Sequence, residues 1–251
     1  MLLHATYIGG PTALLELDGL RLLTDPTFDP GGTDYPTAAY TLHKTQPPAL
    51  APAAVGAVDA VLLSHDHHFD NLDTAGRALL GQARAVYTTV AGAARVGPGT
   101  TALAPWDEVR LTPTLPLTAT PGRHGPEGGD RGPVIGFLLT VDDGPTIYVS
   151  GDTVWYEGVR EVGARARVDV ALLNLGAAKV AVAGPAPLTF TAEEAVLLAE
   201  AWPHTTIVPL HFEGWAHFTE GADEVRRAFA EAGLTDRLNW LSPGVCTPLL
   251  L

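Results

Sequence analysis

Apolar residues along this chain occur in short runs, and the spacing of these runs predicts strands that alternate with helices. Asp18-Gly19 and Asp142-Asp-Gly144 separate neighbouring strand-like segments, and Asp-Gly pairs favour hairpin turns. The predicted strands cover residues 2–8, 12–17, 20–24, 58–63, 85–89, 101–104, 109–112, 115–120, 134–141, 145–150, 168–174, 205–210 and 237–241.

Helical periodicity is expected near residues 72–82, 91–96, 155–163, 191–201 and 220–232. Thr191 and Glu194 form a predicted capping box, and Thr219 followed by Glu220 indicates another helix start. A Pro- and Gly-rich loop over residues 25–52 is long enough to be a lid or a substrate-contacting loop. With no repeat or low-complexity linker, residues 1–251 are expected to form a single domain.

The densest polar segment follows the predicted strand 58–63. It runs from Ser64 to Asp73 and contains three histidines and three aspartates. Loops at the carboxyl ends of strands often carry ligand chemistry, and imidazole and carboxylate groups are ligands that Zn²⁺ prefers. The segment therefore predicts a metal site, with His65 and His67 projecting to the same side if it is extended. The alternative is a helix start capped by Asp70 or Asn71.

Three distant segments add donors of the same kind after strand-like sequence. His124 lies in a Gly- and Pro-rich loop, Asp152 follows Gly151, and His211 ends the predicted strand 205–210. Each has a structural alternative, such as a helix cap for Asp152 or a hydrogen-bonded core imidazole for His211. Four strand ends with metal-type ligands favour one metal centre over four separate explanations.

In this order the motifs resemble those of the metallo-β-lactamase-fold hydrolase superfamily, whose signature is His-x-His-x-Asp-His, a later His, a Gly-Asp pair and a final His. The Thr24-Asp25-Pro26 turn resembles the one after this fold's first hairpin. The segment from His211 to Phe218 is similar to a stand-alone bacterial branch that includes L-ascorbate-6-phosphate lactonase-like and N-acyl-phosphatidylethanolamine phospholipase D-like proteins. The resemblance covers residues 7–241 and implies a four-layer αββα sandwich of the α/β (α+β) class.

The signature contains one extra residue here. Aligned from its left end, it makes His65 and His67 ligands and places Phe69 where the aspartate belongs. Aligned from its right end, Asp70-Asn71-Leu72-Asp73 matches Asp-His-Leu-Asp, which makes His68 the second histidine and puts Asn71 in the third histidine's place. We favour His68 over His67 because its spacing to Asp70 is the normal one. The neutral amide oxygen of Asn71 is a weak zinc ligand.

The resemblance implies metal-assisted hydrolysis of a small ester, lactone or phosphodiester by a metal-activated water. One ion would be held by His65, by His67 or His68, and by His124; Asp152 would bridge to a second ion held by Asp70 and His211. The implied cofactor is zinc, as one or two ions, with Mn or Fe as alternatives. The expected metal ligands are His65, His67, His68, Asp70, His124, Asp152 and His211, and the expected catalytic residues are Asp70, Asp152 and His217.

Further residues have supporting roles in this interpretation. Asp25 would accept a hydrogen bond that fixes a ligand histidine's tautomer, or would simply form a turn. His217 and Tyr156 follow His211 and Asp152 closely and are candidate proton donors, although such residues often only pack. Substrate specificity would lie in residues 25–52 and 180–190.

Composition narrows the partners and the compartment. The 251 residues are 46% hydrophobic, and 28 acidic against 15 basic residues give a net charge of −13, which disfavours nucleic acid and leaves a small-molecule substrate. The apolar stretches are too short for membrane insertion, and the start at Met1 lacks a basic signal region, so a cytoplasmic location is expected. The lone Cys246 excludes an internal disulfide and is expected to be buried. Oligomeric state is left open.

Two other classes of protein are alternatives to a hydrolase. Oxidoreductases on this fold carry an attached flavin or rubredoxin module, and this chain has no Cys cluster to hold such an iron centre. A degenerate metal-binding protein without hydrolytic activity is the stronger alternative, because Asn71 departs from the signature.

Overall fold

The computed structural model describes residues 3–249, whose contacts divide the chain into two compact units. Unit 1 is built from the residues up to Ala104, from Gly214–Ala216 and from the residues after Trp240. Unit 2 is built from Pro105–Glu213 and His217–Trp240. Neither unit is continuous in sequence.

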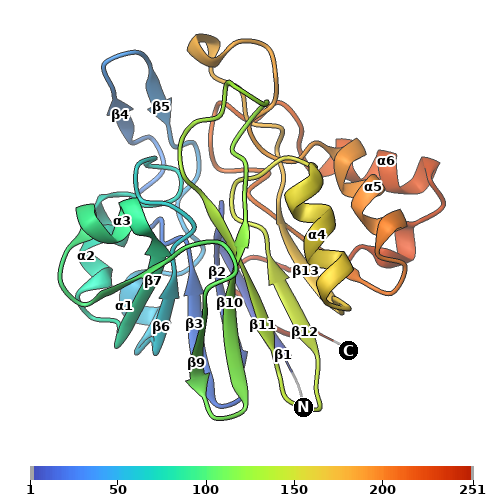
Figure 1. Cartoon of the computed structure of the whole chain (residues 1–251). Helices are drawn as coiled ribbons and strands as arrows, with labels where there is room; N and C mark the ends of the chain where they lie inside the picture. Colours follow the sequence, from blue (N-terminus) through green and yellow to red (C-terminus); the bar gives the residue numbers. More distant parts are fainter. Residues whose placement is uncertain (1–2, 250–251) are drawn as a thin grey trace. The chain divides into compact units, whose positions relative to one another are not determined.

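Unit 1 holds a seven-stranded sheet with the strand order β15-β1-β2-β3-β6-β7-β8, and a two-stranded sheet, β4-β5. Figure 1 shows its helices α2 and α3 beside strands β6 and β7. The elements are β1 (Leu3–Gly9), β2 (Thr12–Leu17), β3 (Leu20–Thr24), β4 (Asp34–Pro36), β5 (Thr41–His43), α1 (Pro52–Val55), β6 (Ala60–Leu62), α2 (Thr74–Leu80), β7 (Ala85–Thr89), α3 (Val90–Val96), β8 (Thr100–Leu103) and β15 (Cys246–Leu249).

One hydrophobic cluster of unit 1 lies between helix α2 and the sheet. Leu79 and Leu80 of α2 are buried in one cluster with Val61 of β6 and Val86 of β7. Strands β3, β6, β7 and β8 pair in parallel, so their carboxyl ends lie at one edge of the sheet. The segment that begins at Ser64 leaves the sheet at this edge.

The predicted loop over residues 25–52 is tied to the start of helix α2. Lys44 is 4% exposed, and its Nζ lies 2.9 Å from Oδ2 of Asp73, the N-cap residue of α2. Asp29 accepts hydrogen bonds from the backbone N–H groups of Thr74 and Ala75 and from the Tyr35 hydroxyl. Burial lowers the pKa of Lys44, and the Asp73 charge opposes this shift. These contacts anchor the segment next to the histidine-rich loop.

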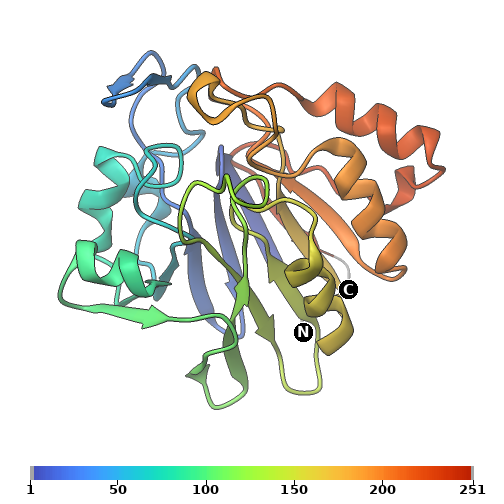
Figure 2. The ribbon, with the colours of Figure 1, turned by 45° about the horizontal axis from the view of Figure 1, so that its top comes forward.

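Unit 2 holds a six-stranded sheet with the strand order β14-β13-β12-β11-β10-β9. Its helices α5 and α6, orange to red in Figure 2, lie side by side. The elements are β9 (Glu108–Thr112), β10 (Leu115–Pro121), β11 (Ile135–Thr140), β12 (Thr146–Val149), α4 (Glu157–Arg165), β13 (Val170–Asn174), η1 (Ala181–Ala183), α5 (Ala192–Ala201), β14 (Thr206–Leu210), α6 (Ala222–Glu231) and η2 (Thr235–Arg237). Among the described residues, no helix is long and apolar enough to span a membrane.

Several local predictions are confirmed. Asp18 and Gly19 both have positive φ, 52° and 76°, as a tight hairpin turn between β2 and β3 requires. The capping box of α5 is present, since the Thr191 hydroxyl accepts from the Glu194 N–H and the Glu194 carboxylate accepts from the Thr191 N–H.

Other local predictions are wrong. Residues 237–241 form no strand; Leu238 follows η2 and makes a single bridge to Ile207. Strand β15 was missed because a proline, here Pro248, disfavours a strand in the sequence pattern. The strand forms because proline is tolerated at the edge of a sheet, where β15 pairs with β1. Cys246 lies on this edge strand and is exposed, not buried. Strands β4 and β5 and helix α1 were also missed.

Some predicted boundaries are shifted. Helix α6 begins after Gly221, whose N–H donates to the Glu224 carboxylate, rather than at Glu220. The first predicted strand starts at Leu2, which lies outside the described residues.

Candidate metal centre

Asp25 organises the start of the histidine-rich loop in unit 1. It follows β3, is 2% exposed, and accepts hydrogen bonds from the Ser64 N–H at 2.6 Å and from the Ser64 hydroxyl at 2.7 Å. Because β3 pairs in parallel with β6, both residues leave the sheet at the same edge. The backbone of Asp25 has φ 24°, an unusual value that often marks functional sites.

Ser64, held by Asp25, in turn orients the His65 ring. The Ser64 hydroxyl has one proton, which it donates to the Asp25 carboxylate, so its oxygen must accept from His65 Nδ1 at 2.9 Å. The neutral His65 imidazole then carries its proton on Nδ1 and presents the lone pair of Nε2. Ligand histidines in metalloproteins are held in this way by their other ring nitrogen.

His65 and His68 bring two ring nitrogens together. His65 Nε2 lies 3.2 Å from His68 Nδ1. Two nitrogens that ligate one tetrahedral zinc ion are about 3.3 Å apart, given Zn–N bonds of about 2.05 Å. His67 packs its ring against both neighbours, with centroids 4.9 Å from that of His65 and 4.3 Å from that of His68. The geometry of the loop thus pairs His68 with His65.

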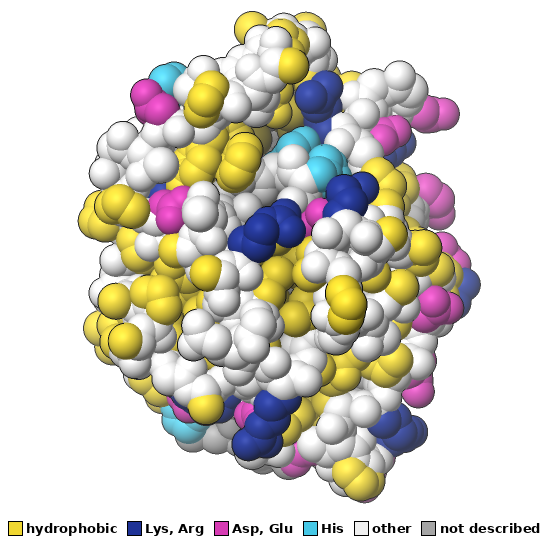
Figure 3. All heavy atoms as spheres, turned by 90° about the vertical axis from the view of Figure 1, so that its left-hand side faces the viewer, with side chains coloured by type: hydrophobic (Ala, Val, Ile, Leu, Met, Phe, Trp, Pro, Cys, Tyr) yellow, Lys and Arg dark blue, Asp and Glu magenta, His cyan; other side chains and the backbone are white. Residues whose placement is uncertain are grey.

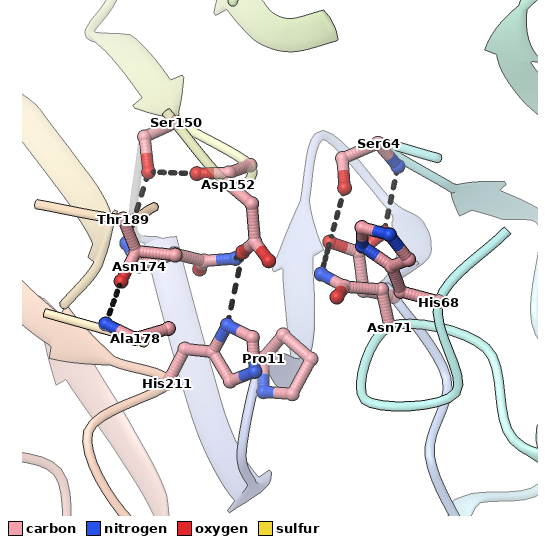
Figure 4. Close-up of polar contacts among 12 residues, drawn as sticks. Pro11, Ser64, His68, Asn71, Ser150, Asp152, Asn174, Ala178, Thr189 and His211 are labelled. Carbon is pink, nitrogen blue, oxygen red and sulfur yellow. Dashed lines mark hydrogen bonds and ion pairs between the residues drawn. The ribbon is translucent and has the colours of Figure 1, made fainter. Parts of the chain in front are cut away.

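Asp70 and Asn71 complete the buried part of this loop, at 5% and 0% exposure. Asn71 Nδ2 donates to Asp25 Oδ2 at 3.3 Å, as Figure 4 shows beside Ser64. Because the Asp25 carboxylate only accepts hydrogen bonds, it fixes the Asn71 amide and turns Oδ1 away from it. Asn71 Oδ1 is buried and has no hydrogen-bond partner among the described residues. Because buried acceptors usually have a partner, this oxygen is a candidate contact for a bound group. The N-cap of α2 is Asp73, so neither Asp70 nor Asn71 is the helix cap.

In unit 2, three polar residues follow neighbouring parallel strands. Strands β12, β13 and β14 pair in parallel, and Asp152, Asn174 and His211 lie at their carboxyl ends. Asp152 Oδ1 accepts from Asn174 Nδ2 at 2.8 Å and from His211 Nδ1 at 2.9 Å. Figure 4 shows the Asp152 carboxylate between these two side chains. Asp152 caps no helix, since the N-cap of α4 is Tyr156.

His124 and His211 are oriented in the same way as His65. His124 Nδ1 lies 2.8 Å from the Leu188 carbonyl oxygen, which only accepts hydrogen bonds, so Nδ1 carries the proton. The His211 Nδ1 proton is held by Asp152. Both neutral rings therefore present Nε2 as a lone pair, and His124 Nε2 lies 3.8 Å from Asp152 Oδ2. His211 also has a left-handed backbone, with φ 55°.

The two predicted proton donors also lie in unit 2. Tyr156 stacks under the Arg123 guanidinium at 4.6 Å, and burial raises the pKa of its hydroxyl. His217 is half-buried, packs its ring on Phe218, and accepts the Lys179 N–H on its backbone oxygen.

Sequence reasoning named Asp25 as an orienting acceptor but missed Ser64 and the Leu188 carbonyl, which contact His65 and His124, and Asn174, which contacts Asp152. Ser64 and Asn174 each end a buried apolar run, the same signal that singled out Asp152 and His211. The Leu188 carbonyl gave no signal, because it reaches His124 across 64 residues of sequence.

Comparisons with known proteins identify the family of the chain. A family model described as "Beta-lactamase superfamily domain" matches residues 20–212. A UPF0173 metal-dependent hydrolase of Opitutus terrae is 34% identical over 183 residues, which cover 69% of this chain and 73% of the relative. An uncharacterized protein of Mycobacterium tuberculosis is 30% identical over 185 residues, 70% of this chain and 49% of the relative. The chain thus spans about half the length of that relative.

Among solved structures, an isothiocyanate hydrolase from Delia radicum gut bacteria superposes with a TM-score of 0.85. It is 25% identical in sequence, and the match covers 97% of this chain and 98% of that structure.

Proposed function

Because the chain belongs to the β-lactamase superfamily and to the UPF0173 metal-dependent hydrolases, we propose that it hydrolyses a small substrate with a metal-activated water. This membership confirms the superfamily and the fold expected from the sequence, while the lactonase-like or phospholipase-like branch stays a prediction. The proposed metal ligands are His65, His68, Asp70, His124, Asp152 and His211.

The observation that carries the proposal is the common orientation of three histidines. His65, His124 and His211 each bind an acceptor through Nδ1: a serine hydroxyl, a backbone carbonyl and a carboxylate. Three buried imidazoles that all present Nε2 lone pairs are the donors that a divalent transition metal prefers. The 3.2 Å approach of His65 Nε2 to His68 Nδ1 and the buried Asn71 Oδ1 also support a bound ion.

A bound divalent ion supplies Lewis acidity and lowers the pKa of water toward about 7. The chain's own residues would then position and move protons. Tyr156 is protonated at neutral pH, as any tyrosine with an ordinary or raised pKa is, and burial raises its pKa further, so its hydroxyl can donate to a leaving group. The Arg123 stack holds that ring in place. His217 is the second proposed donor. Zinc is the proposed metal, with Mn or Fe as alternatives.

The substrate is proposed to be a small ester, lactone or phosphodiester. The solved relative is named an isothiocyanate hydrolase, which adds isothiocyanates to the classes worth testing. The net charge of −13 supports a small molecule over a nucleic acid. The alternative is a degenerate metal-binding protein without hydrolytic activity, because Asn71 stands where the family signature has a histidine.

A substrate screen tests the proposal. Zinc-loaded protein is expected to hydrolyse at least one of the four classes, and activity should disappear after chelation and return when zinc or manganese is restored. Turnover would be followed by chromatography of the products, with chelated protein as the control. Bound metal without turnover on any class would favour the degenerate metal-binding protein.

A further inference from the structure

A hollow in unit 1 lies directly beside the histidine-rich loop. It has a volume of about 440 Å³ and is lined by Asp66, His67, His68, Phe69, Leu72, Arg77 and Arg95. This volume lies within the range of small-molecule sites, about 300–1,000 Å³. All of its lining residues belong to unit 1, and one of them, His68, is a proposed metal ligand.

The hollow is basic in an acidic protein. Two guanidinium groups line it against one carboxylate, although the whole chain carries 28 acidic and 15 basic residues. Figure 3 looks onto this side of the molecule, where histidine, Lys or Arg and acidic side chains lie next to hydrophobic ones. Phe69 is 37% exposed and stacks on Tyr35 with ring centroids 4.7 Å apart. This contact holds the Phe69 ring in place, and the ring forms an apolar side of the hollow.

Asp66 holds the two arginines in place without using all their donors. Its side chain is 1% exposed and accepts from Nε and Nη2 of Arg95, at 2.8 and 2.5 Å. Arg77 Nη2 donates to the Asp66 backbone oxygen at 3.1 Å. The Nη1 groups of Arg77 and Arg95 make no hydrogen bond to any described residue. Such held guanidinium groups are well suited to bind a carboxylate or a phosphate.

Helix α3 packs closely beside Asp66 at Gly92, which has no side chain. A Cβ at Gly92 would lie 3.1 Å from Asp66 Oδ1 and 2.8 Å from Thr88 Oγ1. Arg95 is three residues further along α3, on the same side of the helix. The paired hydrogen bonds from Arg95 to the Asp66 carboxylate therefore depend on the local packing of α3.

We propose that this hollow binds an acidic group of the substrate, with Arg77 and Arg95 as its recognition residues and Phe69 and Leu72 contacting an adjoining apolar part. The inference rests on the proposed function in one respect, namely that the acid is part of the hydrolysed molecule. Binding of the acid itself requires only unit 1.

Titration with benzoate tests the site, with benzamide as a neutral molecule of the same shape. Zinc-loaded protein should bind benzoate at least about tenfold more tightly than benzamide, the difference expected when a charge-assisted hydrogen bond is lost. Arg77→Gln should weaken benzoate binding about tenfold and leave benzamide binding unchanged. Glutamine suits this exposed helical position, so the variant should fold. Dissociation constants would come from chemical-shift titrations.

Arg84→Gln is the matched control, because it removes the same charge from unit 1 but Arg84 does not line this hollow. It should leave benzoate binding unchanged. Equal weakening in both variants, or no weakening in Arg77→Gln, would overturn the proposed acid site. The metal content of the same samples distinguishes failure of the acid site from failure of the proposed function. If a protein that takes up no metal still shows Arg77-dependent benzoate binding, the proposed function is refuted and the acid site is not.

Discussion

Replacing Asp152 with asparagine is expected to reduce hydrolytic turnover by more than about 100-fold, beyond the usual effect of changing an outer residue of a metal site. Asp152 accepts hydrogen bonds from both Asn174 and His211 on one oxygen, and its other oxygen lies 3.8 Å from His124 Nε2. An asparagine has nearly the same shape but no charge, so it cannot serve as an anionic ligand. Turnover would be measured on the substrate found in the screen.

Asp169→Asn is a suitable control in the same unit. Asp169 accepts the Thr146 N–H, pairs with Arg167 and lies outside the proposed ligand set. Both variants should remain folded in thermal melts, and Asp169→Asn should keep its turnover. Wild-type turnover in Asp152→Asn would show that Asp152 has only a structural role.

His68→Ala is expected to weaken metal binding at least about tenfold more than His67→Ala, by analogy with the 10- to 100-fold effects seen even for outer residues of metal sites. His68 Nδ1 is the nitrogen that approaches His65 Nε2 to 3.2 Å, whereas His67 packs its ring against both neighbours. Competition with a chromophoric chelator would give both affinities.

The two variants control for each other, since each removes one imidazole from the same loop. A larger loss in His67→Ala would reverse the assignment and support the alignment of the signature from its left end. Equal losses would mean that the 3.2 Å approach of His65 to His68 does not reflect metal binding.

The regular elements could be predicted where local patterns decide them. Residues 12–17, 20–24 and 85–89 were predicted as strands with the bounds that β2, β3 and β7 have. These segments have strong apolar character and clear turn signals. Whether β15 forms, and whether residues 237–241 form a strand, depends instead on which edge of a sheet is free to pair. The local sequence pattern does not contain that information.

The candidate ligands could be found because each follows an apolar run, but their orientation could not. The hydrogen bonds from Ser64 to Asp25 and from His124 to Leu188 join residues 39 and 64 positions apart. The choice between His67 and His68 depends on how the loop bends after His65. The sequence spacing favoured His68 slightly, and the position of its Nδ1 now supports the same choice.

The most direct test of the central claim is the metal content of the purified protein, measured by elemental analysis after expression with added zinc or manganese. The proposed site predicts at least about one equivalent of metal per chain, falling sharply in His124→Ala, because that change removes a nitrogen donor that the Leu188 carbonyl orients. A protein that carries no metal, and whose thermal stability and activity do not change when either ion is added, would contradict it.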